Sequence, residues 1–383
     1  MCELDDILAF HQRNPHSKAA LATVIYTEGP SYRSPGARSI ITDEGVFRGG
    51  VSAGCLEGDL GCRLDGELTP FVVEYDLSAE DEIRGFPFGC GGKLGIFVEP
   101  LPNTRALNAV QILAALAQPA IVMTVIKVSN SNETGDTRDN RAMIGMRSIC
   151  SVSDSSDVID INWDGEVHQA KTLEQLALAF ACQTKLTKIR TEAIANKSAK
   201  VEELQIGPFD LQIFVEYFEP AISLRIFGDS EDALTLFSMA ENLGLKVRRV
   251  SRRDVRSSAF EGLAFEDKSS ARTYNVVMTH DLILDAKIVA CLLPSDSIYL
   301  GILGPRSRTA RILDSLNVDS QATFESETFY SPVGLDIGAE TPQEIALSIL
   351  SEIQMVAKGR KPQHLKNVDG PIHKRQSTRP VKV

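Results

Sequence analysis

Two cysteines of this 383-residue chain lie inside glycine-rich turns, where a thiol can meet a ligand. One turn runs Gly49-Gly50-Val51-Ser52-Ala53-Gly54-Cys55-Leu56-Glu57-Gly58-Asp59, and the other runs Gly85-Phe86-Pro87-Phe88-Gly89-Cys90-Gly91-Gly92. Glycine has no side chain and tolerates positive φ, so such turns can hold bare backbone N–H groups against a ligand. A thiolate in that position suits a transition metal. The alternative is that both are tight turns whose cysteines are small buried hydrophobes.

The segment before the first turn supplies positive charge. Arg33 and Arg38 lie in a stretch rich in Pro, Gly and Ser that ends at a predicted strand over residues 39–42. The guanidinium group is a planar fork of donors that matches phosphate or carboxylate. We therefore expect both arginines to clamp an anion, with a solvated loop charge as the alternative.

Spacing suggests which thiol is reactive. Leu56, Leu60 and Leu64 recur at helical spacing, so a helix is expected to start near Glu57 and to point its positive end at Cys55. That end favours the thiolate, and Glu57 and Asp59 partly oppose it. Cys90 has no acidic residue close in sequence and is expected to be comparably reactive. Cys62, inside the helix, is expected to be inert.

Two further candidate loops follow apolar strands in the last third of the chain. Thr279 ends a predicted strand over residues 275–279 and His280 follows it, and Gly304 and Arg306 follow another strand over residues 298–302. In an open α/β sheet, ligands bind at the carboxyl ends of the strands. We therefore expect these four residues to line a pocket.

The turn that would bind a dinucleotide is degenerate. A Rossmann first turn requires glycines for its sharp bend and for the approach of the pyrophosphate, and here only Gly228 remains. Asp229, Glu231 and Asp232 crowd the start of the following helix. Each would repel a pyrophosphate by about 1 to 4 kcal/mol. We therefore do not expect NAD(P) to bind tightly.

These residues are positioned by two predicted domains of the α/β class. Residues 1–219 alternate strands with a few helices and predict a mixed, β-rich domain, in which two Ile-Phe-Val-Glu strands near residues 97 and 214 are expected to be neighbours in one sheet. Residues 220–357 alternate strand and helix regularly, which predicts a doubly wound, Rossmann-like parallel sheet. Its last helix carries a capping box formed by Thr341 and Glu344. Residues 358–383 form a basic tail.

Composition excludes several classes of protein. The net charge of −11 argues against nucleic acid as a partner. No apolar run is long enough to span a membrane, and the acidic start is unlike a signal peptide, so a cytoplasmic location is expected. The seven cysteines include no CxxC pair and are read as reduced thiols.

The same residues resemble a known family. The run from Gly29 to Asp59, then Tyr75-Asp76 and Gly89-Cys90-Gly91-Gly92, is similar to the amino-terminal domain of the XdhC/CoxI family of maturation factors for xanthine dehydrogenase and related molybdenum hydroxylases. The other half agrees through Val276-Val277-Met278-Thr279-His280-Asp281, Gly301-Ile302-Leu303-Gly304-Pro305-Arg306-Ser307-Arg308 and Pro332-Val333-Gly334-Leu335-Asp336. The match leaves residues 105–210 largely uncovered. The family typically shows Gly-Ala-Gly at the degenerate turn.

The resemblance implies a protein that binds molybdenum cofactor (molybdopterin), supports its sulfuration and inserts it into a molybdenum hydroxylase client. A cysteine desulfurase is a further implied partner, and we expect a homo-oligomer. Cys55 and Cys90 would be the thiols at the metal, with Arg33 and Arg38 on the phosphate. The other implied cofactor-binding residues are Gly50, Ser52, Gly54, Glu57, Gly91 and Gly92.

Two alternatives remain open at this point. One is an NAD(P)-binding oxidoreductase that uses the Rossmann-like domain, with His280 and Asp281 as an acid and base pair. The other is a scaffold paralogue without a ligand, since fold does not fix function. The resemblance favours a cofactor-binding chaperone over a catalyst.

Overall fold

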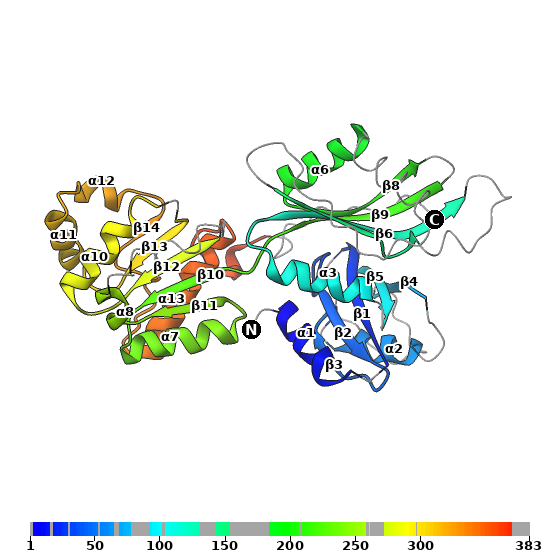
Figure 1. Cartoon of the computed structure of the whole chain (residues 1–383), viewed down its shortest axis with the longest axis horizontal. Helices are drawn as coiled ribbons and strands as arrows, with labels where there is room; N and C mark the ends of the chain where they lie inside the picture. The colour runs from blue at the N-terminus through cyan, green and yellow to red at the C-terminus, as the bar shows by residue number, and fades with distance from the viewer. Residues whose placement is uncertain are drawn as a thin grey trace. The chain divides into compact units, whose positions relative to one another are not determined.

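The computed structural model describes residues 3–15, 18–29, 31–52, 54–64, 69–77, 92–101, 104–130, 143–152, 184–206, 209–257, 260, 272–295 and 297–369. The chain forms two compact units, Glu3–Glu219 and Pro220–Val368 (Figure 1). No helix of these described ranges is long and apolar enough to cross a membrane.

The first unit begins with an antiparallel sheet of five strands. Their spatial order is β3 (Phe47–Gly49), β2 (Arg38–Thr42), β1 (Ala19–Glu28), β5 (Lys93–Pro100) and β4 (Phe71–Asp76). Helix α1 (Glu3–Arg13) contacts β2 and β3. One face of the sheet, with Val24 and Ile96, packs against Leu56 and Leu60 of α2 (Cys55–Arg63). The predicted strands of this region are confirmed.

A second antiparallel sheet follows in the same unit. Its order is β7 (Arg147–Ser151), β6 (Ala120–Asn130), β9 (Phe209–Phe218) and β8 (Ala199–Ile206), and α3 (Thr104–Ala115) precedes it. Leu186 and Ile189 of α6 (Thr184–Asn196) cover one face. The sequence also predicts a strand over residues 158–163 and a helix over residues 172–185. The strand and most of the helix lie outside the described residues.

The two sheets repeat one strand framework. Arg-Ser-Ile occurs at the start of both β2 and β7, and Ile-Phe-Val-Glu occurs in both β5 and β9. The register repeats as well, because Thr23 pairs with Arg38 just as Thr124 pairs with Arg147. Each sheet also has an irregularity at the same place, after Val24 and after Val125. The similar sequences therefore mark a structural duplication.

This duplication corrects one prediction. The two Ile-Phe-Val-Glu strands are not neighbours in one sheet, because β5 pairs with β1 and β4 whereas β9 pairs with β6 and β8. They occupy equivalent places in two sheets. The sheets meet through Phe97 and its equivalent Phe214, which share one buried cluster with Ile25, Tyr26 and Ile126.

Two buried ion pairs cross between the sheets. Arg38 of β2 binds Glu216 of β9, and Arg147 of β7 binds Glu99 of β5. All four side chains are at most 6% exposed. Each arginine also bonds to the backbone two residues before it. Arg38 Nη1 donates to the Gly36 carbonyl at 2.8 Å, and Arg147 Nη1 donates to the Gly145 carbonyl at 3.0 Å. Each half therefore supplies the carboxylate that the other half needs.

The second unit is a parallel sheet covered on both faces. The order is β11 (Lys246–Val250), β10 (Ser223–Phe227), β12 (Thr273–Val277), β13 (Tyr299–Ile302) and β14 (Phe329–Tyr330). Helices α7 (Glu231–Asn242) and α13 (Pro342–Ala357) cover one face. The other carries α8 (Arg252–Arg256), α10 (Leu282–Leu292), α11 (Arg306–Ser315) and α12 (Ser320–Phe324). The predicted doubly wound sheet is confirmed, and its strands follow the order 2-1-3-4-5 in the sequence of the unit.

The last long helix starts as the sequence predicts. The Thr341 hydroxyl accepts from the Glu344 N–H at 3.3 Å, and the Glu344 carboxylate accepts from the Thr341 N–H at 2.9 Å. The Thr341 N–H also holds the pKa of Glu344 below its usual value. After α13 the described chain ends with a short 3-10 turn, Leu365–Asn367.

Candidate functional site

The first glycine turn leads from β3 directly into α2. Gly54 adopts φ 101°, a conformation that favours glycine, and a Cβ on Gly49 would lie 2.4 Å from the Arg38 carbonyl oxygen. The helix begins at Cys55, two residues earlier than the sequence predicts. Cys55 is therefore the first residue of the helix and lies at its positive end.

Glu57 fills this turn from within. Its side chain is completely buried, and Oε1 accepts from the N–H groups of Val51 and Ser52 at 3.0 and 2.9 Å. The Ser52 hydroxyl donates to Oε2 and in turn accepts from the N–H groups of Gly54 and Leu56 at 3.2 and 3.1 Å. A carboxylate can replace a bound anion in this way. These donors are thus used by the fold, which differs from the expectation of bare N–H groups.

The amide of Gly50 is also used, because it donates to the Arg38 carbonyl at 3.1 Å.

The two arginines that were predicted to clamp an anion differ from each other. Arg33 Nη2 lies 2.8 and 2.7 Å from the two carboxylate oxygens of Glu3, and its side chain is 30% exposed. Arg38 is buried against Glu216, so its position fits a structural role. Arg33 alone of the two is open to solvent.

An exposed cluster lies on α2 around Asp59 and Cys62. Positions 55, 59 and 62 share one helical face. Asp59 accepts from Arg63 Nε at 2.7 Å and from the Tyr75 hydroxyl at 2.6 Å. Burial, and then this bond to Asp59, raises the pKa of Tyr75. Cys62 is exposed, so any inertness must come from its chemistry and not from burial.

The second glycine turn lies mostly outside the described residues. These exclude Cys90 and Gly91 and begin again at Gly92, whose carbonyl accepts from the Leu77 N–H at 2.7 Å. In the ranges that the structure does describe, no group of three or more His, Cys, Asp or Glu residues could hold a metal ion. That Cys55 and Cys90 are both thiols at the metal therefore stays a prediction.

The strand-end residues of the second unit occupy loops at one edge of the parallel sheet. Thr279 is buried, and its hydroxyl donates to Asp285 Oδ1 at 2.5 Å. Gly304 has φ 119°, and Arg306 lies exposed with its guanidinium 4.0 Å from the centre of the Phe324 ring. His280 adopts φ 59° and is half exposed. Of the four predicted strand-end residues, Arg306 and His280 are therefore the ones whose side chains reach solvent.

Sequence reasoning missed the buried centre of this edge. Asp285 is fully buried, and its Oδ2 lies 2.7 Å from Arg308 Nη2. The available signal was an acidic residue inside the apolar run of α10, followed by the second arginine after Gly304. A carboxylate in such a run is expected to have a charged partner.

Two acids of the degenerate turn pair with neighbouring loops. Asp229 accepts from Arg252 Nε at 2.6 Å, and this bond lowers the pKa of Asp229. Asp232 lies 3.3 Å from the His280 ring. A Cβ on Gly228 would lie 2.6 Å from the Met278 carbonyl oxygen, so this glycine serves close backbone packing. At the turn where a Rossmann domain would bind a pyrophosphate, Asp229 and Asp232 are thus engaged by Arg252 and His280.

Comparisons with known proteins add independent findings. Residues 224–353 match the family model of the XdhC Rossmann domain, and residues 13–63 match that of the XdhC and CoxI family. A Bacillus subtilis protein described as a probable subunit of xanthine dehydrogenase is 27% identical over 360 residues, which cover 89% of this chain and 94% of that protein. The Escherichia coli protein YqeB is 43% identical over 58 residues, 15% of this chain and 11% of its own length.

One solved structure shares the fold. It is described as a xanthine dehydrogenase from Bacillus halodurans, and it superposes with a TM-score of 0.62 at 24% identity. The superposition covers 94% of this chain and 97% of that one. The family matches and this shared fold agree with the resemblance found in the sequence.

Proposed function

Because the chain belongs to the XdhC and CoxI family, we propose that it is an accessory protein in the maturation of a xanthine dehydrogenase or a similar molybdenum hydroxylase. The observation that carries the proposal is the family match at both ends, together with a relative that aligns with 89% of the chain and whose name refers to xanthine dehydrogenase. The client enzyme is the expected partner.

The finer proposal is that molybdenum cofactor is the cargo, carried while it gains its terminal sulfur and then delivered. A cysteine desulfurase would supply that sulfur. Cys55 lies at the positive end of α2, where a thiolate is favoured, and a thiolate suits molybdenum or its sulfur. In the first unit Arg33, which is paired with Glu3 and 30% exposed, is a solvent-accessible cation that fits the cargo's phosphate. The completed donors around Glu57 support a turn that positions Cys55 more than one that wraps a phosphate.

The thiols provide the test. Cys55→Ala and Cys90→Ala should each abolish retention of the pterin and activation of the client, because each removes a proposed ligand. Cys62→Ala is the matched control, since Cys62 lies on the same face of α2 but away from its positive end. The measurements are pterin per purified protein, client activity in a strain lacking this gene, and the rate of thiol alkylation.

Unchanged pterin retention in both variants, with melting temperatures like that of the wild type, would show that the glycine turns are only turns. A loss in Cys62→Ala as large as in Cys55→Ala would remove the special role of the turn. Light scattering on the same samples tests the predicted homo-oligomer.

We propose further that the Rossmann-like unit does not use NAD(P) as a cofactor. The bond between Asp229 and Arg252 engages side chains that a dinucleotide would need to displace. Binding weaker than about 1 mM is therefore expected in calorimetry with either nucleotide. Micromolar affinity would instead favour the oxidoreductase alternative.

A further inference from the structure

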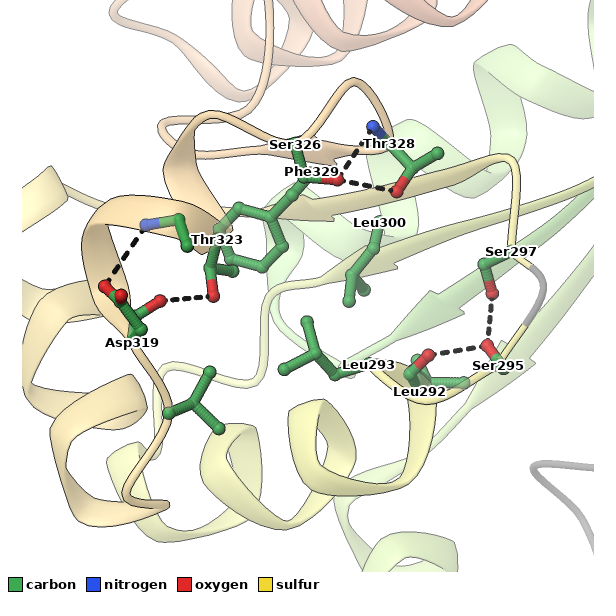
Figure 2. A pocket seen from close by; sticks show the side chains of 12 residues that line it. Leu292, Leu293, Ser295, Ser297, Leu300, Asp319, Thr323, Ser326, Thr328 and Phe329 are labelled. Atoms are coloured by element: carbon green, nitrogen blue, oxygen red, sulfur yellow. Dashed lines mark hydrogen bonds between the residues drawn. The ribbon is translucent and has the colours of Figure 1, made fainter.

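The parallel unit contains a cavity of about 370 Å³ at the edge opposite its strand-end loops. It lies where α10 ends, beside α12, and where β13 and β14 begin (Figure 2). Small-molecule sites usually enclose about 300 to 1,000 Å³ and are mainly apolar with a few fixed polar groups. The apolar lining consists of Leu292, Leu293, Leu300, Val318, Ala322 and Phe329. The size and this lining both fit a small ligand.

One wall of the cavity presents hydrogen-bond acceptors. Ser295 Oγ donates to the Leu292 carbonyl at 2.6 Å, so in its 2.7 Å contact with Ser297 the proton must come from Ser297. Ser297 Oγ accepts from Asn275 Nδ2 at 2.9 Å. Counting the hydrogen bonds among the described residues, each hydroxyl oxygen then keeps one lone pair, because a hydroxyl has one proton and two acceptor positions. A ligand group that faces this wall must therefore donate.

The buried side chain of Asn275 supports this wall although it destabilises the sheet. Asn275 lies in the middle of β12 and is completely buried, and its Oδ1 has no hydrogen-bond partner among the described residues. An unsatisfied buried polar group is destabilising, so an apolar residue would suit the sheet better. Its amide fixes the direction of the Ser297 hydroxyl instead. The polar chain of Asn275, Ser297 and Ser295 is thus fixed before any ligand arrives.

The opposite side supplies a donor. Ser326 and Thr328 lie 3.1 Å apart through their hydroxyls, and one proton satisfies that contact. The other proton remains available. Figure 2 shows this pair and the serine pair on different sides of the cavity. A ligand with both a donor and an acceptor can therefore meet both sides.

Charge in the cavity excludes anions. Among the lining residues that the structure describes, none is Lys, Arg or His. Asp319 is the charged lining residue, and its carboxylate accepts from the N–H groups of Gln321 and Ala322 at 2.9 and 3.2 Å. A phosphate or carboxylate would find a like charge and no counter-ion here. The cavity therefore differs in chemistry from any site for a phosphorylated pterin.

We propose that this cavity is a second binding site, which takes an uncharged small molecule with an apolar body and an amide-like or hydroxyl edge. The site is separate from the cargo site, so its test does not depend on the proposed function.

Benzamide and benzoate are suitable probes because they have the same shape and differ in charge and in the donor. Saturation-transfer NMR on the full chain should show saturable binding of benzamide and at least about tenfold weaker binding of benzoate. Ser297→Ala should weaken benzamide about two- to tenfold, the range of one net hydrogen bond.

Ala322→Trp should block the cavity, since Ala322 lines it from an exposed position on α12. Gln321→Trp is the matched control, because Gln321 is the neighbouring residue, is also exposed and does not line the cavity. Benzamide binding should fall at least fivefold in the first variant and stay unchanged in the second. Absence of saturable benzamide binding, equal binding of benzoate, or equal effects of the two tryptophans would each overturn the proposal.

Discussion

The two sheets of the first unit share a framework but differ in the segment that comes after their second strand. Both carry the Arg-Ser-Ile and Ile-Phe-Val-Glu strands, the same register and one member of each crossed ion pair. After β2, the first half continues through β3 into a turn with four glycines between residues 49 and 58. After β7, the sequence from 152 to 183 contains one glycine, Gly165. The strands and ion pairs that both halves share therefore build the fold. The glycine turn with its thiol belongs to the first half alone in the sequence.

The halves nevertheless depend on each other. The Arg38 carbonyl accepts from the Gly50 amide, so β2 fixes the start of the glycine turn. The Arg38 side chain is held by Glu216 from the second half. A half without its own glycine turn therefore helps to hold that of the other.

The largest effect is expected when the carboxylate of one buried ion pair is removed, which tests whether the two pairs are equivalent. Glu216→Leu leaves Arg38 buried without its partner, and Glu99→Leu does the same to Arg147. Each should lower the free energy of unfolding by about 3 to 5 kcal/mol, because an uncompensated buried charge is costly. Urea denaturation measures the loss. If the two pairs are equivalent, the two losses agree.

The double variants Arg38→Leu with Glu216→Leu, and Arg147→Leu with Glu99→Leu, are the controls for that experiment. Replacing a whole buried pair by apolar residues is often close to neutral, so each should recover most of the loss. A loss below about 1 kcal/mol for either single variant would show that the pair does not stabilise the framework.

A smaller effect should distinguish the halves. Glu57→Gln removes the charge that holds the turn and should cost about 1.5 to 3 kcal/mol, the range for hydrogen bonds to a charged group. It should also speed alkylation of Cys55, because a buried negative charge two residues away disfavours the thiolate. Alkylation followed by peptide mass spectrometry reports both thiols, with Cys62 as the internal reference.

Glu192→Gln on α6 is the matched change in the second half. Glu192 is partly exposed and bonds to Lys200 at 2.9 Å, so its loss should change the free energy of unfolding far less than Glu57→Gln does and leave both thiols unaffected. Equal effects of the two substitutions would mean that the turn has no special dependence on Glu57.

The smallest expected effect is a pH dependence confined to α6. The hydrogen bond from Lys200 lowers the pKa of Glu192 in the folded state. The resulting stabilisation is full above the unfolded pKa of about 4.3 and is lost as the pH falls through the lower folded value. An NMR titration of Glu192 should show the shift, and Lys200→Met should abolish it. A titration midpoint unchanged by Lys200→Met would contradict this origin.

The sequence alone determined much of the fold. Apolar runs predicted β2, β5 and β9 in the first unit, and the strand and helix alternation after residue 220 predicted the parallel sheet. The capping box at Thr341 and Glu344 formed as predicted. These features are local, since they depend on residues a few positions apart whose periodicity and hydrogen bonding the chain itself specifies. The glycines, Cys55 and the start of a helix were local in the same sense.

The tertiary structure was needed to show which donors and charged groups already have partners within the protein. Glu57 could have faced solvent, and burial turned it back onto Val51 and Ser52. Arg38 looked like an open clamp, but its partner Glu216 lies 178 positions away in the other sheet. The two Ile-Phe-Val-Glu strands entered separate sheets because each found its pairing partners in its own half. A local sequence pattern predicts a hydrogen-bond donor or a strand. The partner of that donor or strand depends on packing between segments that are far apart in the sequence.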